Sequence, residues 1–175
     1  MKLNKISQIK NKLKNYLKNK EILDIIVFGS TIKGKSLPRD IDIAIITEKD
    51  ISIPIPEFHV SIIKPKDFFV NIPSLINTLL REGYSLKHDK YLAETYKFSN
   101  KVLFTYQLTN LNSSRKVKIV NFLRGKNNQT GLVKQNQGEW LANQVFVVPI
   151  ETDYLFEQFF LNLRVKYQKS FILIH

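Results

Sequence analysis

Two apolar runs, separated by a short polar segment, constrain the fold of this chain more than any other feature. Residues 24–28 read Asp-Ile-Ile-Val-Phe and end in Gly29, and residues 41–47 read Ile-Asp-Ile-Ala-Ile-Ile-Thr. Short apolar runs rich in β-branched residues are typical of buried strands. Between the two strands, residues 30–35 are expected to form a short helix or turn, which Leu37-Pro38 breaks.

Periodicity elsewhere predicts further elements and an α/β (α+β) fold class. Apolar residues recur every three or four positions from Leu3 to Leu17, which indicates an amphipathic helix. Residues 125–138 are rich in Gly, Asn and Gln, and we expect a mobile loop there. Strands are expected at residues 58–63, 102–108, 145–149 and 165–174, and helices from a cap at Asp67 through residues 75–80, from Ser113 or Ser114 to Gly125, and at residues 154–163.

The chain changes character near residue 95. We expect an α/β domain at residues 1–95 and a basic α+β domain at residues 96–175. The 27 basic and 15 acidic residues give a net charge of +12, and residues 95–138 carry eight basic residues and no acid. Such a stretch indicates a polyanionic partner such as RNA or DNA, although a solvated surface explains it equally well. The residues expected to contact nucleic acid are Arg115, Lys116, Lys118, Arg124 and Lys126.

Other classes are excluded or disfavoured by composition. The chain has no cysteine, which excludes disulfides and thiolate metal sites. The longest uncharged run near the middle, residues 68–80, contains Asn and Pro and is too short to span a bilayer. We therefore expect a cytoplasmic protein without a membrane partner.

Gly29 and Ser30, directly after a buried strand, suit the binding of phosphate. Glycine lets another group approach the backbone closely, and backbone amides at a helix start attract anions. Lys33 and Lys35 are near enough in sequence to add positive charge, so we expect these four residues to hold the terminal phosphates of a nucleotide. The alternative is an ordinary turn glycine followed by surface lysines.

Asp40 and Asp42 bracket Ile41 at the start of the second apolar run. Alternate residues of a strand share one face, so both carboxylates are expected on the same side. Two neighbouring carboxylates favour a cation between them, and hard oxygen ligands with phosphates select Mg²⁺ or Mn²⁺. The alternative is that the two residues only cap a turn and begin a strand.

The stretch Val27-Phe28-Gly29-Ser30, followed after nine residues by Asp40-Ile41-Asp42-Ile43, resembles the signature of the DNA polymerase β superfamily of nucleotidyltransferases, most of all its minimal members. The resemblance covers roughly residues 1–95. It implies a small mixed β-sheet flanked by helices and transfer of a nucleoside monophosphate from a nucleoside triphosphate to a hydroxyl, with two divalent metals. Gly29 and Ser30 would contact the triphosphate, and Asp40 and Asp42 would bind metal.

One position departs from that signature. The third carboxylate of the family is expected on the next strand, where this chain has His59. Glu57 lies two residues earlier and is a substitute if its side chain faces the same way. A neutral imidazole can accept a proton or bind Mn²⁺, which makes His59 a catalytic candidate, although a histidine on a strand more often has a structural hydrogen-bonding role.

Three functions remain compatible with the sequence. The favoured hypothesis is a nucleotidyltransferase whose acceptor is a nucleic acid or a protein. The second is a catalytically impaired module that binds nucleic acid, and the third is a protein-binding role, as in small nucleotidyltransferase-like antitoxins. Phe104, Tyr106 and Phe122 lie among basic residues and are candidates for stacking on bases or, more simply, for core packing.

Overall fold

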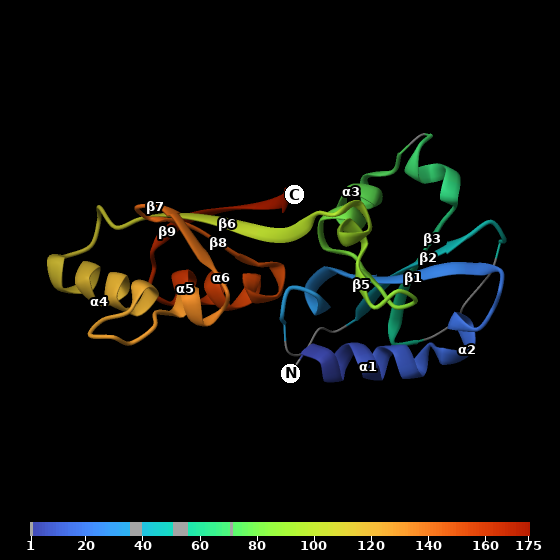
Figure 1. Cartoon of the computed structure of the whole chain (residues 1–175), viewed down its shortest axis with the longest axis horizontal. Helices are drawn as coiled ribbons and strands as arrows, with labels where there is room; N and C mark the ends of the chain where they lie inside the picture. Colours follow the sequence, from blue (N-terminus) through green and yellow to red (C-terminus); the bar gives the residue numbers. More distant parts are fainter. Residues whose placement is uncertain (1, 36–39, 51–55, 71) are drawn as a thin grey trace. The chain divides into compact units, whose positions relative to one another are not determined.

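A computed structural model of the chain describes residues 2–35, 40–50, 56–70 and 72–175, with residues 2–4 as backbone only. The break expected at Leu37-Pro38 lies outside the described residues. The chain divides into two compact units, residues 1–99 with His175 and residues 100–174 (Figure 1). None of the described helices combines the length and the apolar character needed to cross a membrane.

Unit 1 is built on a five-stranded sheet with the order β3-β2-β1-β4-β5. β1 pairs antiparallel with β2, so that Phe28 lies opposite Asp42, and β2 pairs parallel with β3, so that Asp42 lies opposite His59. The sheet is therefore mixed, as expected. The elements of unit 1 are α1 (Lys2–Lys12), α2 (Lys14–Leu17), β1 (Ile22–Phe28), η1 (Gly29–Thr31), β2 (Ile41–Thr47), β3 (Phe58–Ile63), η2 (Pro65–Phe68), α3 (Ser74–Glu82), β4 (Tyr84–Ser85), β5 (Lys90–Tyr91) and η3 (Leu92–Tyr96).

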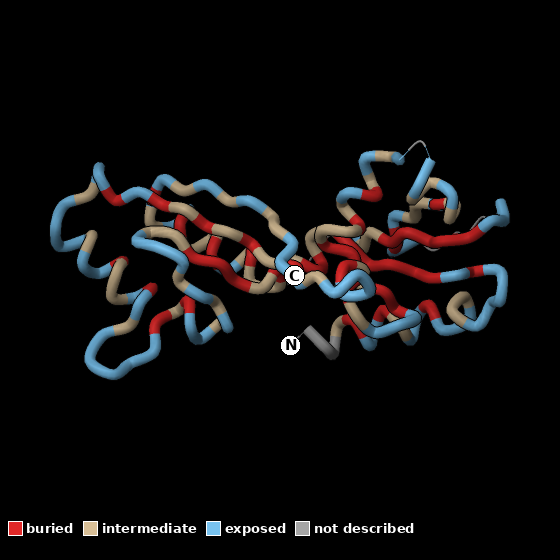
Figure 2. Tube along the Cα trace, turned by 45° about the horizontal axis from the view of Figure 1, so that its top comes forward, coloured by how far each residue is buried: buried red, intermediate tan, exposed pale blue. Residues whose placement is uncertain are grey.

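Helices cover both faces of this sheet (Figure 1). On one face, Ile26 and Ala44 form a buried cluster with Ile76 and Leu79 of α3. The intervening strand residues, such as Ile45, are fully buried and face the side where α1 lies. Burial on both faces explains why the two central strands read as nearly continuous apolar runs, which Figure 2 shows as buried segments.

Unit 2 has a four-stranded sheet with the order β7-β8-β6-β9. Strands and helices alternate along the chain as in a split β-α-β fold, and Figure 1 shows α4, α5 and α6 on one face of the sheet. Phe104, Phe146, Phe156 and Phe160 form its fully buried aromatic core. The elements are β6 (Ser99–Gln107), α4 (Ser113–Arg124), α5 (Leu132–Gln135), β7 (Glu139–Ala142), β8 (Val145–Pro149), η4 (Ile150–Thr152), α6 (Asp153–Asn162) and β9 (Lys166–Ile174).

Two helix starts differ from the prediction. Asp67 does not cap α3, because its carboxylate accepts the Lys64 N–H at 3.0 Å inside the separate turn η2. Asn112, and neither of the two serines, caps α4 by accepting the Arg115 N–H at 2.9 Å. Asp67 and Asn112 each accept a hydrogen bond from a backbone N–H three positions away. Several neighbouring polar side chains could make such a bond, and residue type alone does not decide which one does.

The segment at residues 125–138 is also more ordered than a mobile loop. It contains the helical turn α5, and it leads directly into strand β7, which the sequence pattern did not predict. The Gly138 N–H donates to Val133 O at 2.8 Å, and Gly131 is buried. Polar composition was therefore a poor guide here, because backbone hydrogen bonds and packing hold the segment.

Candidate active site

The centre of the candidate site is the contact between Gly29 and Asp42. Gly29 directly follows β1 with a φ of +74°, and the antiparallel register brings the start of β2 beside it. A Cβ atom on Gly29 would lie 3.3 Å from Cγ of Asp42 and still closer to its Oδ2 atom. Only glycine therefore leaves room for this carboxylate against the turn, for reasons of both backbone conformation and space.

His59 lies on the other side of the same carboxylate. Its Nδ1 atom is 3.2 Å from Oδ1 of Asp42, because the parallel register of β2 and β3 places the two residues side by side. The His59 side chain is 73 % exposed and that of Asp42 is 31 % exposed. The imidazole can therefore orient the carboxylate while it remains accessible to solvent.

The two other candidate carboxylates differ in position. Asp40 is exposed, one residue before β2 begins at Ile41. Glu57 forms an ion pair with Lys12 of α1, a helix on the face opposite α3. Asp42 shares the α3 face, since it lies two residues before the buried Ala44. Glu57 is thus held away from Asp42 and does not replace the missing third carboxylate in this structure.

The donor set fits a hard divalent cation with few protein ligands. Among the residues that the structure describes, no group of three or more Asp, Glu, His or Cys side chains is arranged to hold a metal ion. Mg²⁺ commonly binds proteins through one or two carboxylates and fills its remaining positions with water and substrate phosphates. Asp42, with the space that Gly29 leaves for it, suits that mode, and Asp40 is the nearest second carboxylate in sequence.

A buried residue that the sequence analysis missed holds the glycine turn. Glu82, 1 % exposed, accepts the Gly29 N–H at 3.2 Å through Oε1, and its Oε2 lies 2.9 Å from the Lys33 ammonium. The spacing of Ile76, Leu79 and Glu82 along α3 places all three on the buried face, and this was the available signal. The Gly29 amide and Lys33, both predicted to contact phosphate, are thus engaged by Glu82.

The remaining predicted phosphate contacts stay near the turn. Ser30 is half-buried within η1, and Lys35 is exposed just beyond it. The Lys35 N–H donates to Ser30 O at 3.2 Å, which fixes the path of the backbone between them. Lys35 is therefore better placed than Lys33 to meet an anion arriving from solvent.

Comparison with known proteins agrees with this geometry. Residues 11–65 match the family described as Polymerase beta, Nucleotidyltransferase. Unit 1 contains a nucleotidyltransferase-like domain of the DNA polymerase β superfamily. The matched range includes the glycine turn, both aspartates of the motif and His59, whereas Glu82 and all of unit 2 lie beyond it. No curated protein and no solved structure matches the chain significantly.

The predicted nucleic-acid contacts of unit 2 differ in their exposure and in their partners. The guanidinium of Arg124 lies 3.9 Å above the Trp140 ring, and that of Arg115 donates to Leu163 O at 3.0 Å. Lys116 is half-buried. Lys118 and Lys126, by contrast, are exposed and line one hollow of about 420 Å³.

The three candidate stacking residues also differ in exposure. Phe104 and Tyr106 are buried, and only Phe122, at 56 % exposed, can meet a partner. Burial raises the pKa of the Tyr106 phenol, against the opposing effect of the Arg124 charge. Core packing therefore accounts for two of the three.

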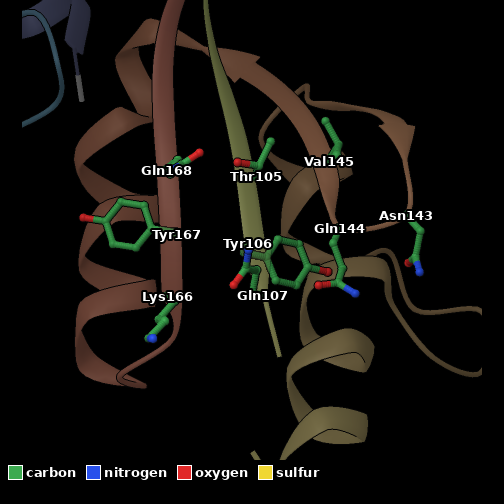
Figure 3. A pocket seen from close by; sticks show the side chains of 9 residues that line it. All are labelled: Thr105, Tyr106, Gln107, Asn143, Gln144, Val145, Lys166, Tyr167 and Gln168. Carbon is green, nitrogen blue, oxygen red and sulfur yellow. The ribbon is translucent and has the colours of Figure 1, made fainter. Parts of the chain in front are cut away.

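A larger hollow lies on the sheet of unit 2. Its volume is about 580 Å³. Amide side chains line it, and Figure 3 shows Lys166 at one end. It has room for a small polar ligand, but it carries no feature that selects one. The amides belong to Gln107, Asn143, Gln144 and Gln168.

Proposed function

We propose that unit 1 is a metal-dependent nucleotidyltransferase. It transfers a nucleoside monophosphate from a nucleoside triphosphate to an acceptor hydroxyl, and pyrophosphate leaves. The observation that carries this proposal is the Asp42 carboxylate seated against Gly29, since it joins a metal ligand to a turn that can receive phosphates.

The residues of the site take separate roles in this proposal. Asp42 and Asp40 would bind Mg²⁺ or Mn²⁺, which would neutralise charge on the triphosphate. Ser30, Lys35 and the Gly29 turn would hold the phosphates, while Lys33 contributes through its pair with Glu82. His59, beside Asp42 and open to solvent, would accept the proton of the acceptor hydroxyl.

Melting of the full chain with Mg²⁺ and a nucleoside triphosphate tests this proposal. At a ligand concentration of about 100 times Kd, binding stabilises the folded state by about 2.7 kcal/mol, which raises the Tm by several degrees. The Asp40→Ala/Asp42→Ala double variant should lose this shift. Asp50→Ala is the matched control, because Asp50 is an aspartate of the same unit that is 93 % exposed. No shift in the wild type, or an equal shift in the double variant, would refute the proposal.

A second candidate is a module that binds the nucleotide or nucleic acid without turnover. It is favoured by the ion pair of Glu57 with Lys12, which leaves His59 where the family has its third carboxylate. Pyrophosphate release separates the two candidates. A Tm shift with no pyrophosphate in the presence of oligonucleotides or protein acceptors would support the binding module. Release that falls in His59→Ala, with the Tm shift retained, would support catalysis.

Unit 2 is proposed to bind the acceptor. Residues 100–138 of this unit carry no acid, which suits RNA or DNA better than a basic or neutral partner. Co-purification of a specific protein would instead favour a protein acceptor or partner. The contacts that the sequence predicts in this unit are Arg115, Lys116, Lys118, Arg124 and Lys126.

A further inference from the structure

An exposed aromatic pair stands at the rim of the smaller hollow of unit 2. Phe122 of α4, 56 % exposed, stacks on Phe159 of α6, with 5.2 Å between ring centroids and 10° between ring planes. Phe122 also lines the hollow of about 420 Å³ between α4 and the segment that follows it. A flat apolar ring is thus supported from behind and open in front, which is the arrangement needed to stack a base.

Basic residues lie near this ring on α4 and in the hollow. Arg115, Lys118 and Phe122 are spaced three and four residues apart, so they share one side of α4. Lys126, beyond the end of the helix, lines the same hollow as Lys118 and Phe122. Because residues 95–138 include no acid, the local sequence offers no carboxylate to neutralise these lysines.

The backbone that forms the far wall of the hollow is well held. The Gly125 N–H donates to Asn121 O at 2.8 Å, and the Gln129 N–H donates to Lys126 O at 3.0 Å. Gly125 has a φ of +95°, and a Cβ there would collide with the backbone of Gln129 and Gly131. The backbone around the hollow is therefore fixed before a ligand binds, which lowers the entropy cost of binding.

We propose that this hollow binds single-stranded nucleic acid, with one base stacked on Phe122 and the adjoining phosphates on Lys118 and Lys126. Stacking on a side chain requires a base whose face is free, which a single strand offers and a duplex does not. The proposal rests on the proposed function in one respect, since it names the acceptor class of the transferase. It places the contact on one side of α4, away from Arg124, which stacks on Trp140.

Fluorescence anisotropy of the full chain with a labelled single-stranded oligonucleotide of mixed sequence tests this site. Phe122→Ala should weaken binding roughly 5- to 150-fold, whereas Phe122→Trp should retain it. Lys118→Ala/Lys126→Ala should weaken binding and reduce the slope of log affinity against log salt by about 1.4, since two phosphate contacts are lost. A duplex of the same length should bind more weakly and be insensitive to Phe122→Ala.

Two variants serve as controls. Val117→Ala removes a side chain that is 57 % exposed from the same helix, and Lys166→Ala removes one charge from the larger hollow. Both should bind as the wild type does. Absence of binding at low salt, or equal binding by a folded Phe122→Ala variant, would overturn the site. A protein that co-purifies only when Phe122 is present, without oligonucleotide binding, would also overturn it.

The outcome is independent of the transferase proposal. The oligonucleotide measurement needs no nucleoside triphosphate, and the Asp40→Ala/Asp42→Ala variant should bind the oligonucleotide as the wild type does. Failure of the binding site would leave the Tm shift with Mg²⁺ and nucleotide unchanged. Failure of the transferase proposal would leave the anisotropy change and its loss in Phe122→Ala unchanged.

Discussion

In each unit a buried carboxylate is paired with a lysine, but the two pairs fix different parts of the structure. In unit 1, Glu82 binds Lys33 and also accepts the Gly29 N–H at the candidate site. In unit 2, the carboxylate of Asp153 at the start of α6 is 2.9 and 3.1 Å from the Lys169 ammonium on β9, and Glu157 is 2.9 Å from the same ammonium. The first pair reaches the backbone of a functional turn, and the second joins a helix to a strand.

The two buried ion pairs are therefore expected to have different roles, one at the candidate site and one in stability alone. Desolvating a carboxylate is costly, so a buried ion pair is weak evidence of a stabilising role by itself. Removing one partner is nevertheless damaging, because a charge is then left buried without compensation. We therefore expect damage to the pair in unit 2 to appear only in stability, and damage around Glu82 to appear in nucleotide binding as well.

The largest expected effect is that of Lys169→Met. The Asp153 side chain, 2 % exposed, would lose its lysine, and the free energy of unfolding should fall by about 3–5 kcal/mol. Urea denaturation measures this change. The Tm shift with Mg²⁺ and nucleotide should persist for unit 1, and its loss would contradict the separation of roles.

The same pair has a predictable pH dependence. Burial lowers the pKa of Lys169, but hydrogen bonds to Glu157 and Asp153 and the charges of both outweigh it, so the pKa is raised above the ordinary 10.5. The resulting stabilisation is complete below the unfolded pKa and is lost as pH rises through the folded pKa. The stability gap between the wild type and Lys169→Met should therefore be constant near neutral pH and narrow above pH 10.5.

The next effect is that of Gly29→Ala, which tests the close contact between Gly29 and the Asp42 carboxylate. Left-handed backbone costs a non-glycine residue about 1–2 kcal/mol, and the new Cβ would also displace Asp42. We expect loss of the Tm shift with Mg²⁺ and nucleotide. Gly34→Ala, at a φ of +91°, carries a similar backbone penalty and is the matched control. Equal loss in both variants would mean that strain, and not the carboxylate, is responsible.

The last variant, Glu82→Gln, is expected to affect both stability and nucleotide binding. The amide keeps an acceptor for the Gly29 N–H but loses the charge that pairs with Lys33, so a cost of about 1–3 kcal/mol is expected. Titration of the nucleotide by calorimetry should show weaker binding, because the glycine turn is held less firmly. An unchanged affinity for the nucleotide would mean that Glu82, like Asp153, contributes only to stability.

Local pattern was sufficient for the central part of the fold. The strands expected at residues 41–47 and 58–63 occur with those bounds. The first is a buried central strand, which requires a continuous apolar run, whereas the second is a partly buried edge strand. The motif of Gly29, Ser30, Asp40 and Asp42 also carried the family resemblance, which the match over residues 11–65 confirms. Caps, α5 and β7 were missed or misplaced, because their hydrogen bonds depend on neighbours that residue type does not specify.

Only the tertiary structure decided which side chains meet. By sequence, Glu57 and His59 were both candidates for the position of the third carboxylate. In the structure, Glu57 forms an ion pair with Lys12 of α1, whereas the register of β2 and β3 places His59 beside Asp42. Phe104 and Phe122 were equivalent candidates until packing buried one and left the other exposed. Periodicity determines which residues form strands and which face they share, whereas strand order and helix packing determine which carboxylate, imidazole or ring reaches a site.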